Sequence, residues 1–151
     1  QALVTVKRDT YAEYLGAGLG DGVMLDFYGR QRALSQQMAK DVCLAARGDR
    51  GAGLLIELSE TIGIFDNSLT AFVDGMPMAG IAPPPTEAIA AQLKVARDIW
   101  TPIRPTALEI AAGRKVDAAA FETFSIEIDR FLVEMNKAVG MLADHKATRS
   151  G

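Results

Sequence analysis

The feature that most constrains the fold is a regular spacing of apolar residues, which alternates between three and four positions along most of the chain. It is clearest between positions 55 and 72, where successive apolar residues lie 3, 4, 3, 4 and 3 positions apart. On an α-helix this spacing places every member on one stripe, the arrangement that packs in left-handed helical bundles. The members are Leu55, Leu58, Ile62, Phe65, Leu69 and Phe72.

The same alternation predicts three more helices. One begins at Asp21, a favourable N-cap, and extends to about Arg47. Another begins after Thr86, also a good N-cap, and ends at Gly113, and the last follows Asp117. The expected inward residues of these last two helices are Ile89, Leu93, Ala96, Trp100, Ile103, Ala107 and Ile110, and then Phe121, Phe124, Ile128, Phe131, Met135, Ala138 and Leu142.

Prolines and glycines mark the interruptions. Three successive prolines exclude helix from part of the segment 76–85, which should be a loop. Pro102 and Pro105 lie inside the third predicted helix and should kink it near Trp100. Four glycines between positions 16 and 22 make one continuous helix unfavourable there.

Four helices with one apolar stripe each are best satisfied by an antiparallel four-helix bundle. We therefore predict an all-α protein with a single domain over residues 1–151. The bundle should occupy residues 21–146, and residues 1–20 should form a short extra N-terminal segment.

Composition excludes several classes of function. The net charge of −3, with no basic cluster, argues against nucleic acid as a partner. One histidine and one cysteine are too few for a zinc site, for haem attachment through Cys-x-x-Cys-His or for the Glu-x-x-His pairs of a di-iron bundle, and no histidine lies near a serine nucleophile. The sequence therefore predicts no enzyme, no cofactor and no metal site. No apolar run is long enough to span a membrane, and the start at Gln1 fits a removed signal peptide or a piece of a longer chain.

The stretch 29–40, GRQRALSQQMAK, lies in the first predicted helix, and its two sides need separate explanations. Its expected inward stripe is formed by Met24, Phe27, Gln31, Leu34, Met38, Val42 and Ala45. Its opposite side combines small residues, Gly29 and Ala33, with charged ones. A second helix could therefore approach this side closely.

The two arginines of this stretch lie on different shoulders of the helix, roughly 200° apart. Arg30 follows Asp26 by four positions, the favourable order for a helical ion pair. Arg32 has no acidic residue three or four positions away; its neighbours there are Tyr28, Gly29, Ser35 and Gln36. A guanidinium suits a planar oxyanion or a carboxylate, and two copies of Arg32 brought together by a two-fold axis would repel without such an anion. The alternative is that Arg32 projects into solvent.

These residues resemble the N-terminal domain of type IV pilus methyl-accepting chemotaxis proteins, the PilJ type, which is related to the nitrate/nitrite sensor domain of NarX-type kinases. The resemblance covers about residues 21–146 and rests on Gly29 to Arg32, Leu34 to Gln36 and Met38 to Lys40. It continues through 80–86, 100–104 and 135–139. It implies a periplasmic sensor in signal transduction and chemotaxis, with no membrane contact except through a segment absent from this chain.

The resemblance also implies roles for individual residues. In nitrate-sensing relatives, the arginine that matches Arg32 binds nitrate at a two-fold dimer interface. The expected ligand-binding residues are Arg32, Gly29, Tyr28, Ser35, Gln36, Arg30 and Asp26. This chain departs from the family pattern at Asp26, Tyr28, Ala33 and Gln37. Asp26 adds a negative charge and Gln37 removes the positive charge of the usual arginine, and both changes oppose anion affinity.

Two functions remain open from the sequence. The first is a homodimeric sensing domain for a small molecule, such as an oxyanion or a carboxylate. The second is a non-catalytic helical adaptor or structural bundle that binds a protein partner. Arg32 distinguishes them, because only the sensor needs its charge to respond to a ligand.

Overall fold

A computed structural model describes residues 20–48 and 51–150 of the chain. In this part the chain forms four α-helices and one short 3-10 turn, with no strand beyond an isolated bridge between Met76 and Ile81. The elements are α2 (Gly20–Ala46), α3 (Ala52–Asp74), η1 (Pro77–Ala79), α4 (Glu87–Ala111) and α5 (Ala118–Ser150).

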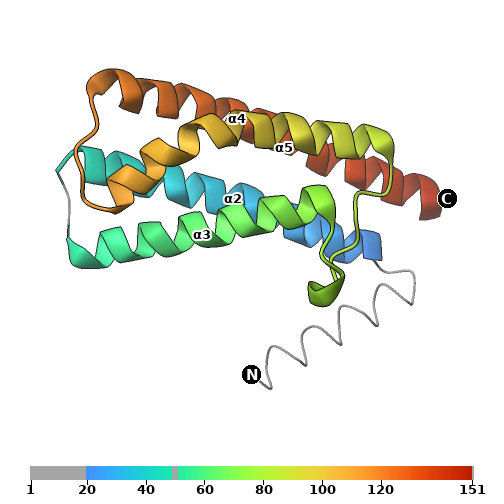
Figure 1. The fold of residues 1–151 in the computed structure, drawn as a ribbon. Coiled ribbons are helices and arrows are strands. Elements are labelled where there is room, and N and C mark those ends of the chain that lie inside the picture. Colours follow the sequence, from blue (N-terminus) through green and yellow to red (C-terminus); the bar gives the residue numbers. More distant parts are fainter. Residues whose placement is uncertain (1–19, 49–50, 151) are drawn as a thin grey trace.

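Successive helices run in opposite directions and form one bundle (Figure 1). Helix α2 packs against α3 and α5, and α4 packs against the same two helices from the other side. The predicted all-α antiparallel four-helix bundle is confirmed. The predicted N-terminal segment lies outside the described residues except for Gly20, and the domain limits stay a prediction.

Local capping chemistry sets the ends of the helices. Thr86 precedes α4, and its side-chain oxygen accepts a hydrogen bond of 3.1 Å from the Ile89 backbone N–H, as expected of an N-cap. Asp117 plays the same part for α5, because its Oδ1 accepts a 2.7 Å hydrogen bond from the Ala120 N–H. Gly113, which follows α4, has a φ of +80°, a conformation that other residues adopt at a cost.

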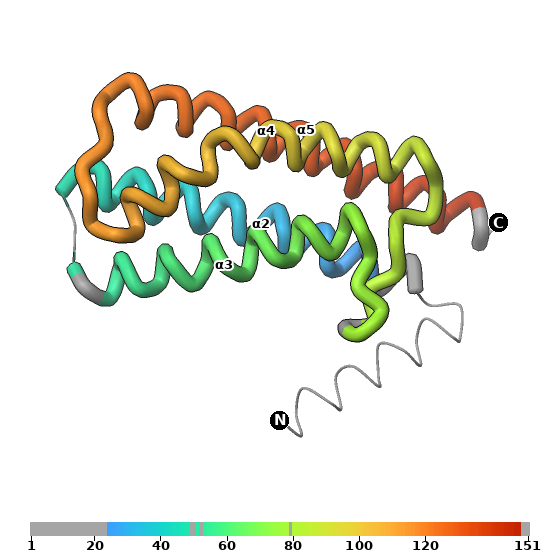
Figure 2. Tube along the Cα trace, in the orientation of Figure 1, coloured from blue at the N-terminus to red at the C-terminus, as the bar shows by residue number. Residues whose placement is uncertain are grey.

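Helix α4 continues through both of its prolines, Pro102 and Pro105. Figure 2 shows the axis of α4 changing direction in its second half, the half that contains them. The predicted kink is therefore present, and it does not end the helix. Among residues 20–48 and 51–150, no helix combines the length and the apolarity that crossing a membrane requires.

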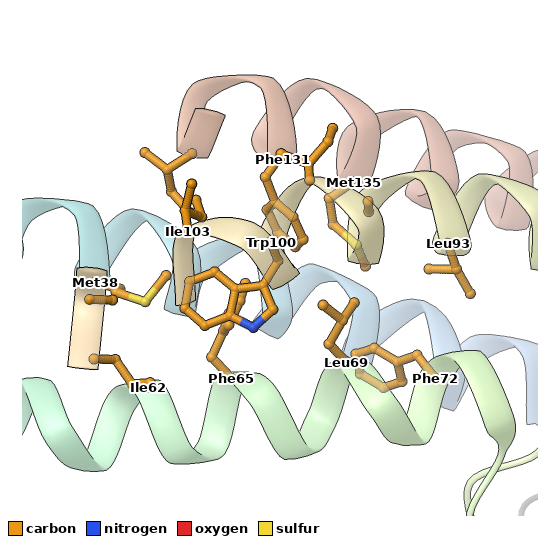
Figure 3. Close-up of a cluster of buried hydrophobic side chains, with 14 of the residues drawn as sticks. Met38, Ile62, Phe65, Leu69, Phe72, Leu93, Trp100, Ile103, Phe131 and Met135 are labelled. Atoms are coloured by element: carbon orange, nitrogen blue, oxygen red, sulfur yellow. The ribbon is translucent and has the colours of Figure 1, made fainter. Parts of the chain in front are cut away.

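The centre of the core is aromatic (Figure 3). The centroid of the Phe65 ring of α3 lies 4.7 Å from that of the Trp100 ring of α4, edge to face, and 5.0 Å from that of the Phe131 ring of α5. The indole N–H of Trp100 donates a 2.9 Å hydrogen bond to Asp66 Oδ1, so its polar atom is satisfied. Asp66 Oδ2 also pairs with Arg104 Nε at 3.2 Å. Three helices are joined by this cluster.

Candidate functional site

Helix α2 turns most of its predicted face to the core, because five of the seven expected inward residues are buried: Met24, Gln31, Met38, Val42 and Ala45. Apart from Asp41, the buried residues of α2 follow a regular alternation of four and three positions: Met24, Tyr28, Gln31, Ser35, Met38, Val42 and Ala45. Phe27 and Leu34, which the apolar pattern places inside, are only half-buried. We call the row of residues that a helix turns to the core its seam. The seam of α2 is therefore regular in position, but it contains polar side chains.

Tyr28 and Ser35, two of the expected ligand-binding residues, are both 0% exposed, so their side chains face the core and not the outer side of α2. The Tyr28 ring packs against the Phe72 ring of α3, with centroids 5.0 Å apart. Ser35 Oγ donates a 2.6 Å hydrogen bond to the backbone oxygen of Arg32. Both occupy seam positions of α2, so the packing of the helix places them inside.

The other residues expected at the site lie toward the outer side of α2. Asp26, Arg30, Arg32 and Gln36 are exposed, and Gly29 is half-buried. A Cβ atom added at Gly29 would meet nothing within 4 Å, so the packing of the single chain does not require a glycine there. The described residues form three ion pairs, and a pair between Asp26 and Arg30 is not among them.

Arg32 has a partner that sequence reasoning missed. Its Nη1 donates a 3.1 Å hydrogen bond to Oδ1 of Asn136 on α5, a residue 104 positions later in the chain. No carboxylate of the described residues forms an ion pair with Arg32. The guanidinium is thus held by a neutral group and keeps its full charge. The available signal was that Asn136 lies in the resembling stretch 135–139.

The opposite flank of α2 carries acidic groups. Gln37 Nε2 donates a 3.1 Å hydrogen bond to Glu57 Oε1 on α3. Asp41, one turn further along, is 3% exposed, and burial raises the pKa of its carboxyl, with the nearby Glu57 raising it further. The α5 side of α2 is therefore the side that suits an anion.

Two clefts in the described residues lie away from Arg32. One of about 710 Å³ lies where the end of α2 meets the start of α5, lined in part by Cys43, Arg47 and Lys115. Another of about 530 Å³ lies between α4 and α5. The described residues hold no group of three His, Cys, Asp or Glu side chains arranged for a metal ion.

The comparisons with known proteins agree on the class. The fold resembles the solved ligand-binding domain of the P. aeruginosa nitrate receptor McpN, with a TM-score of 0.62 and 25% sequence identity. The similarity covers 80% of this chain and 94% of that domain. No curated protein matches the chain. A bundle of this kind is therefore a sensing domain of the chemoreceptor type.

Residues 19–123 match the family described as the N-terminal domain of type IV pili methyl-accepting chemotaxis transducers, PilJ. Because the match spans more than half of the chain, the chain belongs to this family. The resemblance drawn from residues 29–40 is confirmed.

Proposed function

We propose that the chain is a periplasmic sensing domain that binds a small oxyanion, with nitrate as the first candidate, between two copies of α2. The family supports a role in chemotaxis or type IV pilus signalling, and the resemblance to the sensor domain of NarX-type kinases adds two-component signalling as an alternative output. The name of the similar receptor supports nitrate as the first ligand to test.

The observation that carries this proposal is the state of Arg32. Its guanidinium is exposed on α2, hydrogen-bonded to an amide, and without a carboxylate partner among the described residues. A planar guanidinium fork recognises a planar oxyanion through parallel N–H···O bonds. Two such forks facing each other across a two-fold axis would hold one anion and be held together by it.

The small residues beside Arg32 support close approach of a second helix. Gly29 carries no side chain and Ala33 is exposed, so the α2 backbone is accessible near the arginine. Tyr28, whose bulk would crowd this surface, lies instead in the core. Tyr28, which departs from the family pattern, therefore does not obstruct the surface beside Arg32. Asp26, a second departure, is exposed and lowers the local positive potential.

Signal transfer follows from the place of the site. A ligand that binds one arrangement of the two α2 helices more tightly than another shifts the population toward that arrangement. Because α2 packs against both α3 and α5, a small displacement of α2 changes the packing of its neighbours.

The test compares Arg32 with Arg47, an exposed arginine that directly follows the end of α2. Nitrate at 100 times its Kd should stabilise the wild-type dimer by about 2.7 kcal/mol, or roughly half of that per chain, seen as a rise in Tm over the same concentration of sodium chloride. Arg32→Ala should abolish this rise, whereas Arg47→Ala, which removes an exposed charge about four helical turns away, should keep most of it. No rise with nitrate, nitrite or small carboxylates would favour the adaptor function.

The dimer has a separate test at Gly29. The Gly29→Leu side chain begins in open space, so the bundle should stay folded. The bulk should nevertheless block the second α2 helix and yield monomers in sedimentation velocity. An unchanged oligomer in this variant would show that the interface lies elsewhere.

A further inference from the structure

The contact between Arg32 and Asn136 joins two helices that are far apart in the sequence. Asn136 directly follows Met135 and lies two positions before Ala138, and both of these residues are 0% exposed. These core positions fix the rotation of α5, so Asn136 lies on the flank of α5 that faces α2. Its Oδ1 then accepts the 3.1 Å hydrogen bond from Arg32 Nη1.

The chemistry of this partner distinguishes Arg32 from the two arginines that form ion pairs among the described residues. Arg104 pairs with the carboxylate of Asp66, and Arg130 pairs with that of Glu127. Arg32 is oriented instead by an amide, which accepts a hydrogen bond and adds no negative charge. An ion pair would position the guanidinium equally well but would cancel the charge that an anion needs.

The amide also has a direction. A guanidinium only donates hydrogen bonds, so the oxygen of Asn136 must face Arg32, and its NH₂ group must point elsewhere. Among the described residues, the Asn136 NH₂ group donates no hydrogen bond. Arg32 and Asn136 together therefore present unused N–H donors, a set that suits an anion with several oxygen acceptors better than a spherical halide.

We infer that Asn136 is a positioning residue of the anion site, which holds the Arg32 guanidinium in place without neutralising it and offers its own NH₂ group to the oxyanion. This inference rests on the proposed function and deepens it. It assigns selection for oxyanions over chloride to a pair of side chains on α2 and α5.

The test is the replacement of one amide by a carboxylate. Asn136→Asp should weaken the binding of sodium nitrate, measured by calorimetry at constant ionic strength, by about tenfold or more, because the new carboxylate competes for the guanidinium. The same variant without nitrate should gain about 1 °C in Tm at low salt, because it forms a surface ion pair. A merely structural role for Asn136 would not move affinity and stability in opposite directions.

Two further variants complete the experiment. Asn67→Asp makes the same change at an exposed position of α3 and should leave nitrate affinity within about twofold of wild type, as expected for a screened distant charge. Asn136→Ala should lower affinity by about two- to tenfold, because Arg32 must then be ordered by the ligand alone. Wild-type affinity in Asn136→Asp, while Arg32→Ala abolishes binding, would overturn this inference and leave the proposed function intact.

Failure of the proposed function has a different signature. If the wild-type chain binds no nitrate, the anion role of Asn136 fails with it. Whether Asn136 contacts Arg32 can still be tested without nitrate, by measuring whether Asn136→Asp raises the Tm of a protein that already carries Arg32→Ala. Loss of the gain there supports the contact, and persistence of the gain overturns it.

Discussion

The seam of α2 and the seam of α4 pack into the same core with opposite chemistry. All eight buried residues of α4 are apolar: Ile89, Leu93, Ala96, Ile99, Trp100, Ile103, Ala107 and Ile110. Helix α2 buries Gln31, Ser35 and Asp41, three of the four buried polar or charged residues in the described chain. The helix that carries the candidate site is therefore the one with the more polar contact to the core.

The difference extends to individual polar atoms. The only polar atom of the Trp100 side chain is hydrogen-bonded to Asp66. On α2, Gln31 Nε2 donates to the Phe65 backbone oxygen at 2.8 Å, but Gln31 Oε1 and Asp41 Oδ2 are buried without a hydrogen-bond partner among the described residues. Each such atom costs about 1–3 kcal/mol. A helix held this way moves at a lower cost than one held by an aromatic cluster, which suits a helix that must respond to a ligand.

The largest expected effect tests the aromatic side of this comparison. Phe65→Ala removes the ring that contacts both Trp100 and Phe131, and should lower the free energy of unfolding by about 3–5 kcal/mol. Urea denaturation followed by circular dichroism measures this loss. A loss below about 1 kcal/mol would mean that the cluster is not the stable part of the bundle.

A substitution among the buried polar residues of α2 should change the free energy of unfolding in the opposite direction. Asp41→Asn removes a buried charge and should raise the free energy of unfolding at pH 7 by about 1 kcal/mol. Burial and Glu57 raise the pKa of Asp41 above its ordinary value of 3.8, so the folded state binds the proton more tightly than the unfolded state does. The contribution of this group is favourable at low pH, and it declines as pH rises from 3.8 through the folded-state pKa.

Urea denaturation at a series of pH values checks this sign. The advantage of Asp41→Asn over wild type should grow across the window above pH 3.8 and then level off. An advantage that is constant with pH, or a destabilised variant at pH 7, would show that the carboxylate of Asp41 is well accommodated between α2 and α3.

The smallest effects compare two glutamines that bridge neighbouring helices. Gln92 on α4 donates to both the backbone oxygen and Oε2 of Glu134 on α5, at 2.8 and 2.6 Å, and helps to lower the pKa of that carboxyl. Gln92→Ala should cost about 1 kcal/mol. Gln37→Ala removes one exposed bond to Glu57 and should cost about 0.5 kcal/mol or less. Equal losses of stability for the two variants in parallel thermal unfolding experiments would mean that the α4–α5 contact is no stronger than the α2–α3 contact.

The sequence predicts α3, α4 and α5 well because apolar residues occupy their seams. Only Leu55 and Phe121 of the expected inward residues in these helices are half-buried rather than buried. The cap at Thr86 was also predictable, because its hydrogen bond to Ile89 depends on residues three apart.

The seam of α2 is predicted less well. Polar residues occupy seam positions 31 and 35, so a pattern built on apolar residues includes Leu34 and Phe27 and leaves out Tyr28 and Ser35. Local spacing also cannot reveal Asn136, because its contact with Arg32 depends on how α5 packs beside α2. The lack of a nearby acidic residue and the family resemblance indicate Arg32 from the sequence, and its proposed role stays a prediction.

The most direct test of this account is calorimetric titration of the wild-type chain and Arg32→Ala with sodium nitrate, against sodium chloride at the same ionic strength. We expect saturable binding of about one nitrate per two chains in the wild type, because a two-fold pair of Arg32 side chains shares one anion. We expect none in Arg32→Ala. Binding of one nitrate per chain that survives Arg32→Ala, or no binding by the wild type, would contradict a site on the outer side of α2.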